Sequence, residues 1–572
     1  MQSERAAAPA APQSSSCARQ DRTVVACNLV DLEQARRERG VSLRAFATQT
    51  GTPRSTLQDQ LRAAQDDGLP SGWQPFLESE VGVGFVLRLL VVVLVVFVLR
   101  GGCSAELAAE FFEAMHLRRY LAASPTSLRR VFAQILTHTQ AWGGQQFERL
   151  AKAMAPRDLV LALDENFHWE SMLLVVLDVA TGFVFAEHPS DTRDGETWAK
   201  VVRESLAGYN VCLRAVTRDG GTWLGTCAER LGVPAGHDIF HIQYAVCRAS
   251  AGPLATRVRR AQEAVQARKE DLAALRAERA LATAAPRGPG RPPDWDAREA
   301  IATRALEATE HQATTMQAQR EAMQSSIRAL GDAHHPVNLE TGAVVEAVQA
   351  RARLQQVAQT LCERAAEAHL GTRTLKALHG VFKRLDDLAG IVAWWHQEVR
   401  RRLSSLSLPA VEVTWIETVL VPALYVQHRI ALGRDEEERT ALGALWERLR
   451  ATVTSPDSPW GAWDAERRRG VQAVVEECVR LFPRSTSALE GHNGQDALCQ
   501  HQRHRLPEGF RKARLVVRNY VITRADGTTA AERLFGNKPG DLIEYLTEHI
   551  KLPARGRLGS PRPKPPLLAL TG

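Results

Sequence analysis

Two stretches of this 572-residue chain decide its fold class: LVLALDENF at residues 159–167 and VCLRAVTRDGGTW at residues 211–223. Each begins with a short apolar run, of the length and β-branched character of a buried strand, and each then reaches an acid, Asp164 or Asp219. Residues that follow such strands in an open α/β sheet line a crevice at the sheet edge. If the two strands are neighbours in the sheet, Asp164 and Asp219 lie at one edge of it.

The sequence around these stretches predicts further elements of the same layer. Apolar runs predict strands at 159–163, 172–179, 183–186, 211–217 and 237–241, and periodic patterns predict helices at 194–208 and 223–231. A turn at Thr181 and Gly182 joins the second and third strands as a hairpin. Three strands followed by alternating helix and strand predict a mixed sheet with helices on its faces.

Carboxylates that converge at a sheet edge suit hard divalent cations such as Mg²⁺ or Mn²⁺, which prefer oxygen ligands. Two such ions about 3.5–4 Å apart can activate a water or 3′-hydroxyl and stabilise the leaving oxygen of a phosphodiester. A structural alternative stays open, because single acids after strands often begin turns. Asp219 precedes Gly220 and Gly221, as a turn-initiating residue does.

The order of elements and three motifs resemble a known family. LALDENF around Asp164, TRDGGTW around Asp219 and HDIFHI at residues 237–242 are similar to the α/β ribonuclease H-like core of bacterial insertion-sequence DDE transposases and of retroviral integrases. The segment SALEGHNGQDAL, with Glu490 and Asn493, resembles the family's third motif, and NYVITRADGTTAAERLFG at residues 519–536 resembles its terminal segment. The resemblance implies that Asp164, Asp219 and Glu490 are the catalytic residues and hold the metal ions.

Glu490 departs from the simplest members of the family, because a long stretch separates it from Asp219. The resemblance then requires a large helical insertion between the fifth strand and the glutamate helix. A second interpretation of Glu490 stays open. Ser487 and Glu490 match a capping box, in which the glutamate binds the first amide of its own helix.

The N-terminal region has the spacing of a helix-turn-helix at residues 42–64 (SLRAFATQTGTPRSTLQDQLRAA). Ser42 caps the first predicted helix, and Gly51 supplies the turn. The second helix would expose Arg54, Ser55 and Gln58 to DNA. The alternative is an ordinary helical hairpin, which has the same spacing.

Residues 81–99 (VGVGFVLRLLVVVLVVFVL) are almost wholly apolar and approach the length of a membrane span. Arg88 interrupts the run and leaves 11 uninterrupted apolar residues, a length typical of a buried core helix. The β-branched residues also fit a strand. A buried helix is the favoured interpretation, with membrane association as the alternative.

Residues 254–330 predict an antiparallel helical hairpin with near-heptad apolar spacing, interrupted by PRGPGRPP at residues 286–293. The hairpin is either a solvated coiled coil or an arm for dimerisation or for grasping DNA ends through phosphate contacts. The arginines that would make those contacts are Arg257, Arg259, Arg260 and Arg268. Gly290, Arg291 and Pro292 also match the core of a minor-groove AT-hook, with a plain linker as the alternative.

Composition bounds the class of protein. The chain is 45% hydrophobic and 24% charged, as in globular proteins, and its net charge of +7 favours a polyanionic partner. Nine scattered cysteines with no Cys-x-x-Cys pair indicate reduced thiols in the cytoplasm. The expected domains are a disordered leader (1–20), a helix-turn-helix region (21–75), a helical region with the apolar segment (76–155), the first part of the core (156–250), a helical insertion (251–470), the glutamate helix with the C-terminal helical part of the core (471–550) and a basic Pro-rich tail (551–572).

The resemblance implies a transposase that cleaves transposon ends with two Mg²⁺ or Mn²⁺ ions and transfers them into target DNA. Its partners would be double-stranded DNA and further copies of itself, on the nucleoid and without a small-molecule cofactor. The alternatives are a non-enzymatic DNA-binding regulator derived from a transposase, and a membrane-anchored regulator. Other polar residues have mainly structural interpretations: Glu165, Asp178, Asp238 and His241, and a loop at His334 and His335.

Overall fold

The computed structural model describes residues 40, 42–50, 54, 73–117, 120–168, 171–218, 221–284, 291–482, 491–494 and 506–553. The chain forms two compact units. The first, here called the terminal unit, comprises Met1–Gln146, Arg505–Val521 and Gly540–Gly572. The second, here called the sheet unit, comprises Phe147–His504 and Ile522–Pro539.

The terminal unit joins the two ends of the chain in one helical core. Helix α5 packs against α24, and η1 packs against α22 and α6. The Trp142 ring lies 6.0 Å from that of Tyr520, edge to face. Its helices are α2 (Leu43–Thr50), α4 (Trp73–Glu78), α5 (Glu80–Val93), the π-helix η1 (Leu94–Arg100), α6 (Ala105–Ala114), the first part of α7 (Pro125–Lys152), α22 (Glu508–Tyr520) and α24 (Leu542–His549).

The apolar segment 81–99 is helical, as the favoured interpretation expects, and it is buried in part. Leu90 and Leu94 are fully buried, whereas Phe85 and Phe97 are about half exposed. Arg88, which interrupts the run, forms an exposed ion pair with Glu544 of α24. Within the described part of the chain, α5 with η1 is the one helix long and apolar enough to cross a membrane, and 44% of its most apolar window is buried in the protein. These properties are compatible with a soluble protein.

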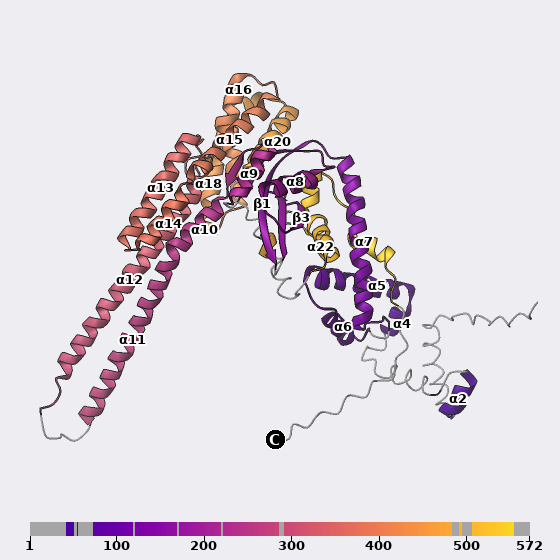
Figure 1. Ribbon diagram of the computed structural model, residues 1–572, viewed down its shortest axis with the longest axis horizontal. Helices are drawn as coiled ribbons and strands as arrows, with labels where there is room; N and C mark the ends of the chain where they lie inside the picture. Colours follow the sequence, from indigo (N-terminus) through magenta and orange to yellow (C-terminus); the bar gives the residue numbers. More distant parts are fainter. Residues whose placement is uncertain are drawn as a thin grey trace, which may run out of the picture. The chain divides into compact units, whose positions relative to one another are not determined.

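The sheet unit contains one five-stranded sheet of order β3-β2-β1-β4-β5. Strand β1 pairs antiparallel with β2, and β2 antiparallel with β3, whereas β1 with β4 and β4 with β5 are parallel. The elements are β1 (Arg157–His168), β2 (Ser171–Asp178), β3 (Val184–Ser190), α8 (Gly195–Leu206), β4 (Val211–Arg218), α9 (Thr222–Leu231), β5 (Ala235–His237) and α10 (Ile239–Ala249). The strands and helices therefore follow one another in the order that the sequence predicts (Figure 1).

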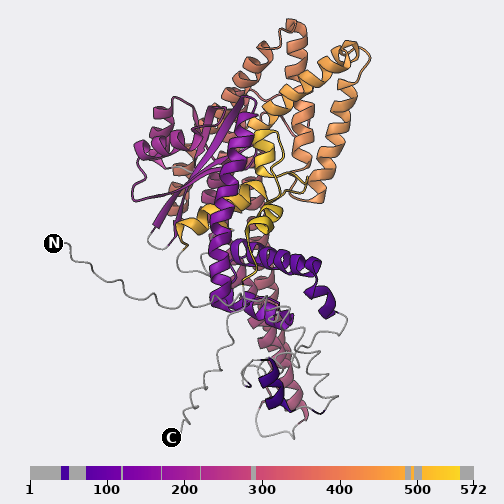
Figure 2. The same cartoon turned by 90° about the vertical axis from the view of Figure 1, so that its right-hand side faces the viewer.

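The two faces of the sheet carry different helices. Glu165 of β1 contacts Trp198 of α8 and Trp223 of α9. Val160, whose side chain lies on the opposite face of the strand, packs with Leu481 and Trp394. Helices α8 and α9 thus cover one face, and helices of the insertion cover the other, where Figure 2 shows them in orange beside the purple strands.

The insertion after α10 is helical throughout its described elements. Two apolar clusters hold it together, one around Trp395 and Tyr425 and one around Leu354 and Leu388. The elements are α11 (Ala251–Ala284), α12 (Trp295–Ala333), α13 (Ala347–Glu367), α14 (Thr372–Phe382), α15 (Leu385–Ser404), α16 (Ala410–Trp415), the π-helix η3 (Ile416–Leu420), α17 (Val421–Ile430), α18 (Glu436–Val453), α19 (Pro459–Ala462) and α20 (Ala465–Leu481); α23 (Ala530–Phe535) also belongs to the sheet unit.

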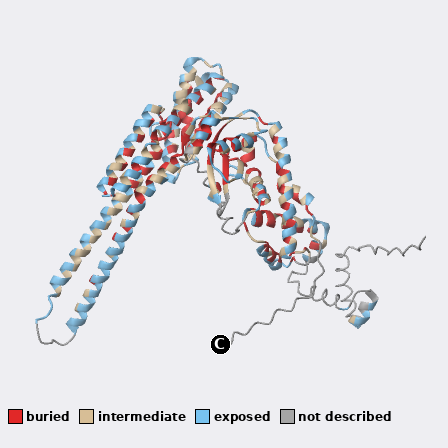
Figure 3. Cartoon of the chain, viewed as in Figure 1, coloured by how far each residue is buried: buried red, intermediate tan, exposed pale blue. Residues whose placement is uncertain are grey.

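Helices α11 and α12 form the expected antiparallel hairpin. Its proximal half buries Leu254, Val258 and Ala261, whereas Leu272 is the one buried residue of α11 beyond them. The distal half is accordingly almost all exposed or intermediate (Figure 3). Ion pairs such as Lys269–Glu310 join its two helices.

At the end of the sheet opposite to Asp164, an ion-pair network joins the strands to the insertion. Arg401 and Arg402 of α15 each donate to Asp158 Oδ2, at 2.6 and 2.7 Å. Glu398, whose side chain is 4% exposed, accepts from Arg214 of β4 at 2.7 Å and also pairs with both arginines of α15. Burial acts to raise the pKa of Glu398, but hydrogen bonds from Arg401 and Arg214, together with their charges, lower it to about 2.

Three sequence predictions need correction. Strand β1 does not end before Asp164 but continues to His168, because residues 161–168 all pair with β2. Strand β5 ends at His237 instead of 241, because the Asp238 side chain caps α10 by accepting from Phe240 N at 2.8 Å. The polar stretch 451–470, for which the sequence also predicts a linker, contains α19 and the first turns of α20.

Candidate functional site

Asp164 is the first residue of β1 beyond the described pairing of this strand with β4. The last described parallel pair of β1 and β4 is Leu163 with Arg218, one residue before Asp164. On the other side, Asp164 pairs with Val175 of β2, and Val175 pairs with Glu187 of β3. Directly paired residues share one face of a sheet. Asp164 and Glu187 therefore belong to one row across one face, with Val175 between them.

A short helical segment, residues 491–494, binds this row with two consecutive residues. Asn493 Nδ2 donates to Asp164 Oδ2 at 2.9 Å. His492 Nε2 lies 2.8 Å from Glu187 Oε1, and the two side chains are only 2% and 9% exposed. The sequence predicts Asn493 one turn after Glu490, but it gives no signal for the His492–Glu187 pair. Residues more than 300 positions apart thus meet at Asp164.

The other Asp164 oxygen is held by the strand itself. Glu165 N donates to Asp164 Oδ1 at 2.9 Å. The Glu165 side chain points to the opposite face, as strand alternation predicts. There its Oε1 accepts from Trp223 Nε1 at 2.5 Å and from Trp198 Nε1 at 3.4 Å. The backbone amide that contacts Asp164 is therefore anchored from the other side of the sheet.

Two of the three predicted metal ligands, Asp219 and Glu490, lie outside the described residues. In the sequence, Asp219 directly follows Arg218, and Glu490 directly precedes Gly491. Among the residues that the structure describes, no three His, Cys, Asp or Glu side chains form a metal-binding group.

The carboxyl ends of β4 and β5 are joined by an acid of the insertion that the sequence does not single out. Asp387 Oδ2, in the first turn of α15, lies 3.0 Å from His237 Nε2 and 3.7 Å from an Arg218 nitrogen.

Asp238 is fully buried as the cap of α10, with His241 Nε2 at 3.8 Å. Asp238 and His241 thus have the structural role that the sequence favours.

Asp178 is also a structural acid. It is fully buried at the end of β2, where its Oδ2 accepts from Thr181 N at 2.9 Å and from Thr181 Oγ1 at 2.5 Å. Burial raises its pKa above the ordinary value. These bonds close the turn before β3, in which Gly182 has a φ of 73°.

The predicted helix-turn-helix is described only in its first part. Helix α2 begins after Ser42, whose Oγ accepts from Ala45 N at 3.2 Å, as the predicted cap requires. Arg54 is helical and exposed. Ser55 and Gln58 lie outside the described residues.

The arginines predicted for the hairpin have different environments. Arg257 donates to the carbonyls of Ala368 and His369 at 2.6 and 3.1 Å, so it holds the end of α13. Arg259 and Arg268 pair with acids of their own helix, Glu263 and Asp271. Arg260 is exposed. Of the predicted hook, Gly290 lies outside the described residues, and Arg291 and Pro292 are exposed.

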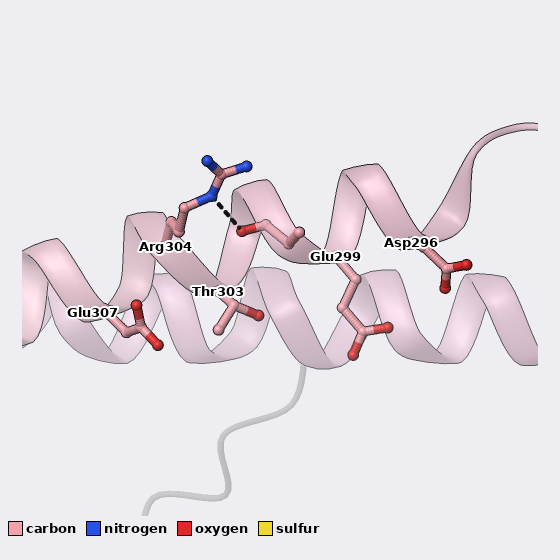
Figure 4. Close-up of a pocket in the computed structure, with 6 residues that line it drawn as sticks. Asp296, Glu299, Thr303, Arg304 and Glu307 are labelled. Atoms are coloured by element: carbon pink, nitrogen blue, oxygen red, sulfur yellow. Dashed lines mark hydrogen bonds between the residues drawn. The ribbon is translucent and has the colours of Figure 1, made fainter.

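A pocket opens along α12 near the hairpin tip, where Glu299 and Glu307 lie on either side of Thr303 (Figure 4). Arg304 Nε donates to the carbonyl of Ala300 there, at 3.2 Å. The acids are already compensated in part, since Glu299 pairs with Arg276 and Arg279. The pocket therefore has the character of an ion-paired helix surface.

Two buried histidines follow α12, where the sequence predicts a loop. His335 Nδ1 lies 2.6 Å from the Tyr425 hydroxyl, and the His334 ring packs 5.3 Å from that of Phe482. Both histidines are fully buried. They join the insertion core, a role that their sequence neighbours do not indicate.

Comparison with known proteins gives one family. A protein family of unknown function, DUF6399, matches residues 416–562. The match contains His492 and Asn493, but neither β1 nor Asp164. A comparison with curated proteins finds no match.

Proposed function

We propose that this chain is a metal-dependent DNA transposase with a ribonuclease H-like core, which cleaves transposon ends and transfers them into target DNA. One observation carries the proposal. In the sheet of order β3-β2-β1-β4-β5, Asp164 comes one residue after the last described β1–β4 pair, and a distant helical segment binds that carboxylate through Asn493. Such a sheet edge is where α/β folds bring reactive side chains together.

Chain connectivity supports the assignment of the other two acids. Asp219 follows Arg218, the partner of Leu163, and successive Cα atoms are about 3.8 Å apart. Glu490 precedes Asn493 by three residues, a span of at most roughly 11 Å even when fully extended. The proposal assigns Asp219 and Glu490 to the site on these sequence positions and on the resemblance.

The donor atoms at this edge fit a hard divalent cation. Asn493 Oδ1 is buried and has no hydrogen-bond partner among the described residues. It belongs to the same amide that contacts the Asp164 carboxylate. Carboxylate and amide oxygens are the ligands that Mg²⁺ and Mn²⁺ favour. Asp164 and Asn493 would hold the metal together with Asp219 and Glu490.

Bound ions of this kind polarise a phosphodiester and lower the pKa of the attacking water or hydroxyl. The protein contributes the orientation of the ligands. Glu165 N and Asn493 Nδ2 each bind one oxygen of Asp164, so the plane of the carboxylate is fixed. The buried His492–Glu187 pair holds the segment that carries Asn493 against the sheet. Ligands fixed in this way lose little entropy when the substrate phosphate arrives.

The same proposal assigns the remaining parts of the chain. Helix α2 with Arg54, Ser55 and Gln58 would bind duplex DNA, and the net charge of +7 supports a polyanionic partner. Transposition needs two DNA ends, so the active form would be an oligomer of this chain on DNA. Its location would be the nucleoid.

Strand nicking of end-labelled transposon DNA in Mg²⁺ or Mn²⁺ tests the proposal. Asp164→Asn should slow cleavage by about three orders of magnitude, the loss of several kcal/mol of transition-state stabilisation. Asp191→Asn, an equivalent change at an exposed acid after β3, should cleave as the wild type does. If Asp164→Asn cleaves at the wild-type rate, or if the wild type does not cleave, the proposal is wrong.

A further inference from the structure

An aromatic and cationic cluster lies on the opposite face of β1 from Asp164. Phe167 of β1 is a large apolar side chain that is 61% exposed. The Arg193 guanidinium carbon, in the loop before α8, lies 4.2 Å from the centroid of the Trp223 ring and 6.0 Å from that of Phe167. We call Phe167, Arg193 and Trp223 the aromatic cluster.

The position of Trp223 is fixed from two sides. Its Nε1 donates to Glu165 at 2.5 Å. Its ring lies against Gly221, where a Cβ atom would come within 2.6 Å of the ring carbons. The indole is therefore a rigid support for the stacked guanidinium above it. A rigid planar surface loses little conformational entropy when a ligand stacks on it.

Arg193 keeps its charge available at the surface. It is exposed, and among the described residues no carboxylate lies within ion-pair distance of it. The neighbouring Asp194 is occupied as the cap of α8, where it accepts from the amides of Glu196 and Thr197. An exposed ring beside an uncompensated planar cation attracts anionic ligands that have a π face, which is the chemistry of a nucleotide in an unpaired strand.

The cluster and the proposed reaction site share strand β1, although they lie on its two faces. Phe167 follows Asp164 by three residues on one strand, which corresponds to roughly 10 Å. We propose that the aromatic cluster binds an unpaired nucleobase of the DNA strand whose phosphate is cleaved at Asp164. The inference rests on the proposed function, because that function supplies the strand. A base inside a duplex has both faces stacked, so only an unpaired base can offer a face to Phe167 or Arg193.

Binding of the full-length protein to two labelled DNAs tests this inference without cleavage. One DNA is a blunt duplex, and the other carries a short single-stranded extension with 2-aminopurine; both are measured in Ca²⁺. Phe167→Leu and Arg193→Ala should each weaken binding of the extended DNA by about tenfold, the loss of one base-stacking contact. Both variants should bind the blunt duplex within about twofold of the wild type, and Phe167→Leu should lose the quenching of 2-aminopurine fluorescence.

Arg450→Ala is the matched control, because Arg450 lies 5.2 Å over the Trp446 ring in another part of the sheet unit. It should bind both DNAs as the wild type does. The inference is overturned if Phe167→Leu and Arg193→Ala bind the extended DNA normally, or if they lose affinity equally for both DNAs. The proposed function fails separately, when the wild type does not cleave in Mg²⁺ although the selective loss of base binding is observed.

Discussion

The two ends of strand β1 meet helical segments through different chemistry. At the Asp158 end, carboxylates and guanidinium groups are matched. Arg401 and Arg402 bind Asp158, and Arg214 binds Glu398. At the Asp164 end, Asn493 Nδ2 and the backbone amide of Glu165 donate to the carboxylate. The buried amide oxygen of Asn493 is not used in a hydrogen bond with any described residue.

This difference teaches how to separate structural acids from functional ones in one protein. The acids of the first end are bound by arginines that come from the same sheet and the same insertion helix, so their charges are satisfied within the fold. At the second end, the Asn493 amide that contacts the Asp164 carboxylate also carries a buried oxygen, and the proposed metal site would use both residues. Both ends attach helical segments to the sheet, and the proposed function places the reaction at the second end.

The largest expected effect on stability comes from removing the charge of Glu398 in the ion-pair network at the Asp158 end of β1. Glu398→Gln should lower the free energy of unfolding at pH 7 by about 3 kcal/mol, because it leaves arginines of a buried network without their carboxylate. Chemical denaturation measures this change. Glu477→Gln is the control, since that side chain is 53% exposed and forms an ion pair with Arg402; its effect should stay below about 1 kcal/mol.

The loss of unfolding free energy in Glu398→Gln should also depend on pH. The pKa of Glu398 is lowered to about 2 from an ordinary value of 4.5, so its contribution is complete above the unfolded-state pKa and is lost as pH falls toward 2. The difference between wild type and Glu398→Gln should therefore shrink between pH 4.5 and 2. A difference that stays constant over this range, or that is no larger than for Glu477→Gln, would contradict the account of this end.

A smaller loss of stability is expected when the His492–Glu187 pair at the Asp164 end of β1 is removed. His492→Ala removes the partner of the buried Glu187 and should lower the free energy of unfolding by roughly 2 kcal/mol. It should also slow DNA cleavage, because the segment with Asn493 is no longer held against the sheet. His188→Ala, at the exposed neighbour of Glu187, should change neither quantity. Cleavage at the wild-type rate by His492→Ala would show that this contact does not orient the site.

The strands of the sheet could be predicted because their apolar runs are local. The extension of β1 beyond Asp164 could not, since residues 164–166 are polar and form a strand only by pairing with β2. The end of β5 at His237 could not be predicted either, because Asp238 acts as a helix cap and not as a strand residue. In both cases a neighbouring element decides the structure.

In the candidate site, the sequence singles out Asp164 and Asn493 but not the residues that support them. Asp164 follows an apolar run, and Asn493 belongs to a motif that the sequence shows. Glu187, His492 and Asp387 carry no such signal, because each acquires its role from a partner far away in the sequence. Contacts of this kind become visible only when the chain is folded.

Binding of Mn²⁺ to the full-length protein tests the central claim most directly. Electron paramagnetic resonance titration should show that the wild type binds Mn²⁺ and that Asp164→Asn binds it at least about tenfold more weakly, through loss of a charged oxygen ligand. Glu398→Gln should bind Mn²⁺ as the wild type does, because its end of β1 is satisfied within the fold. Equal binding by wild type and Asp164→Asn would contradict the assignment of Asp164 to a metal site.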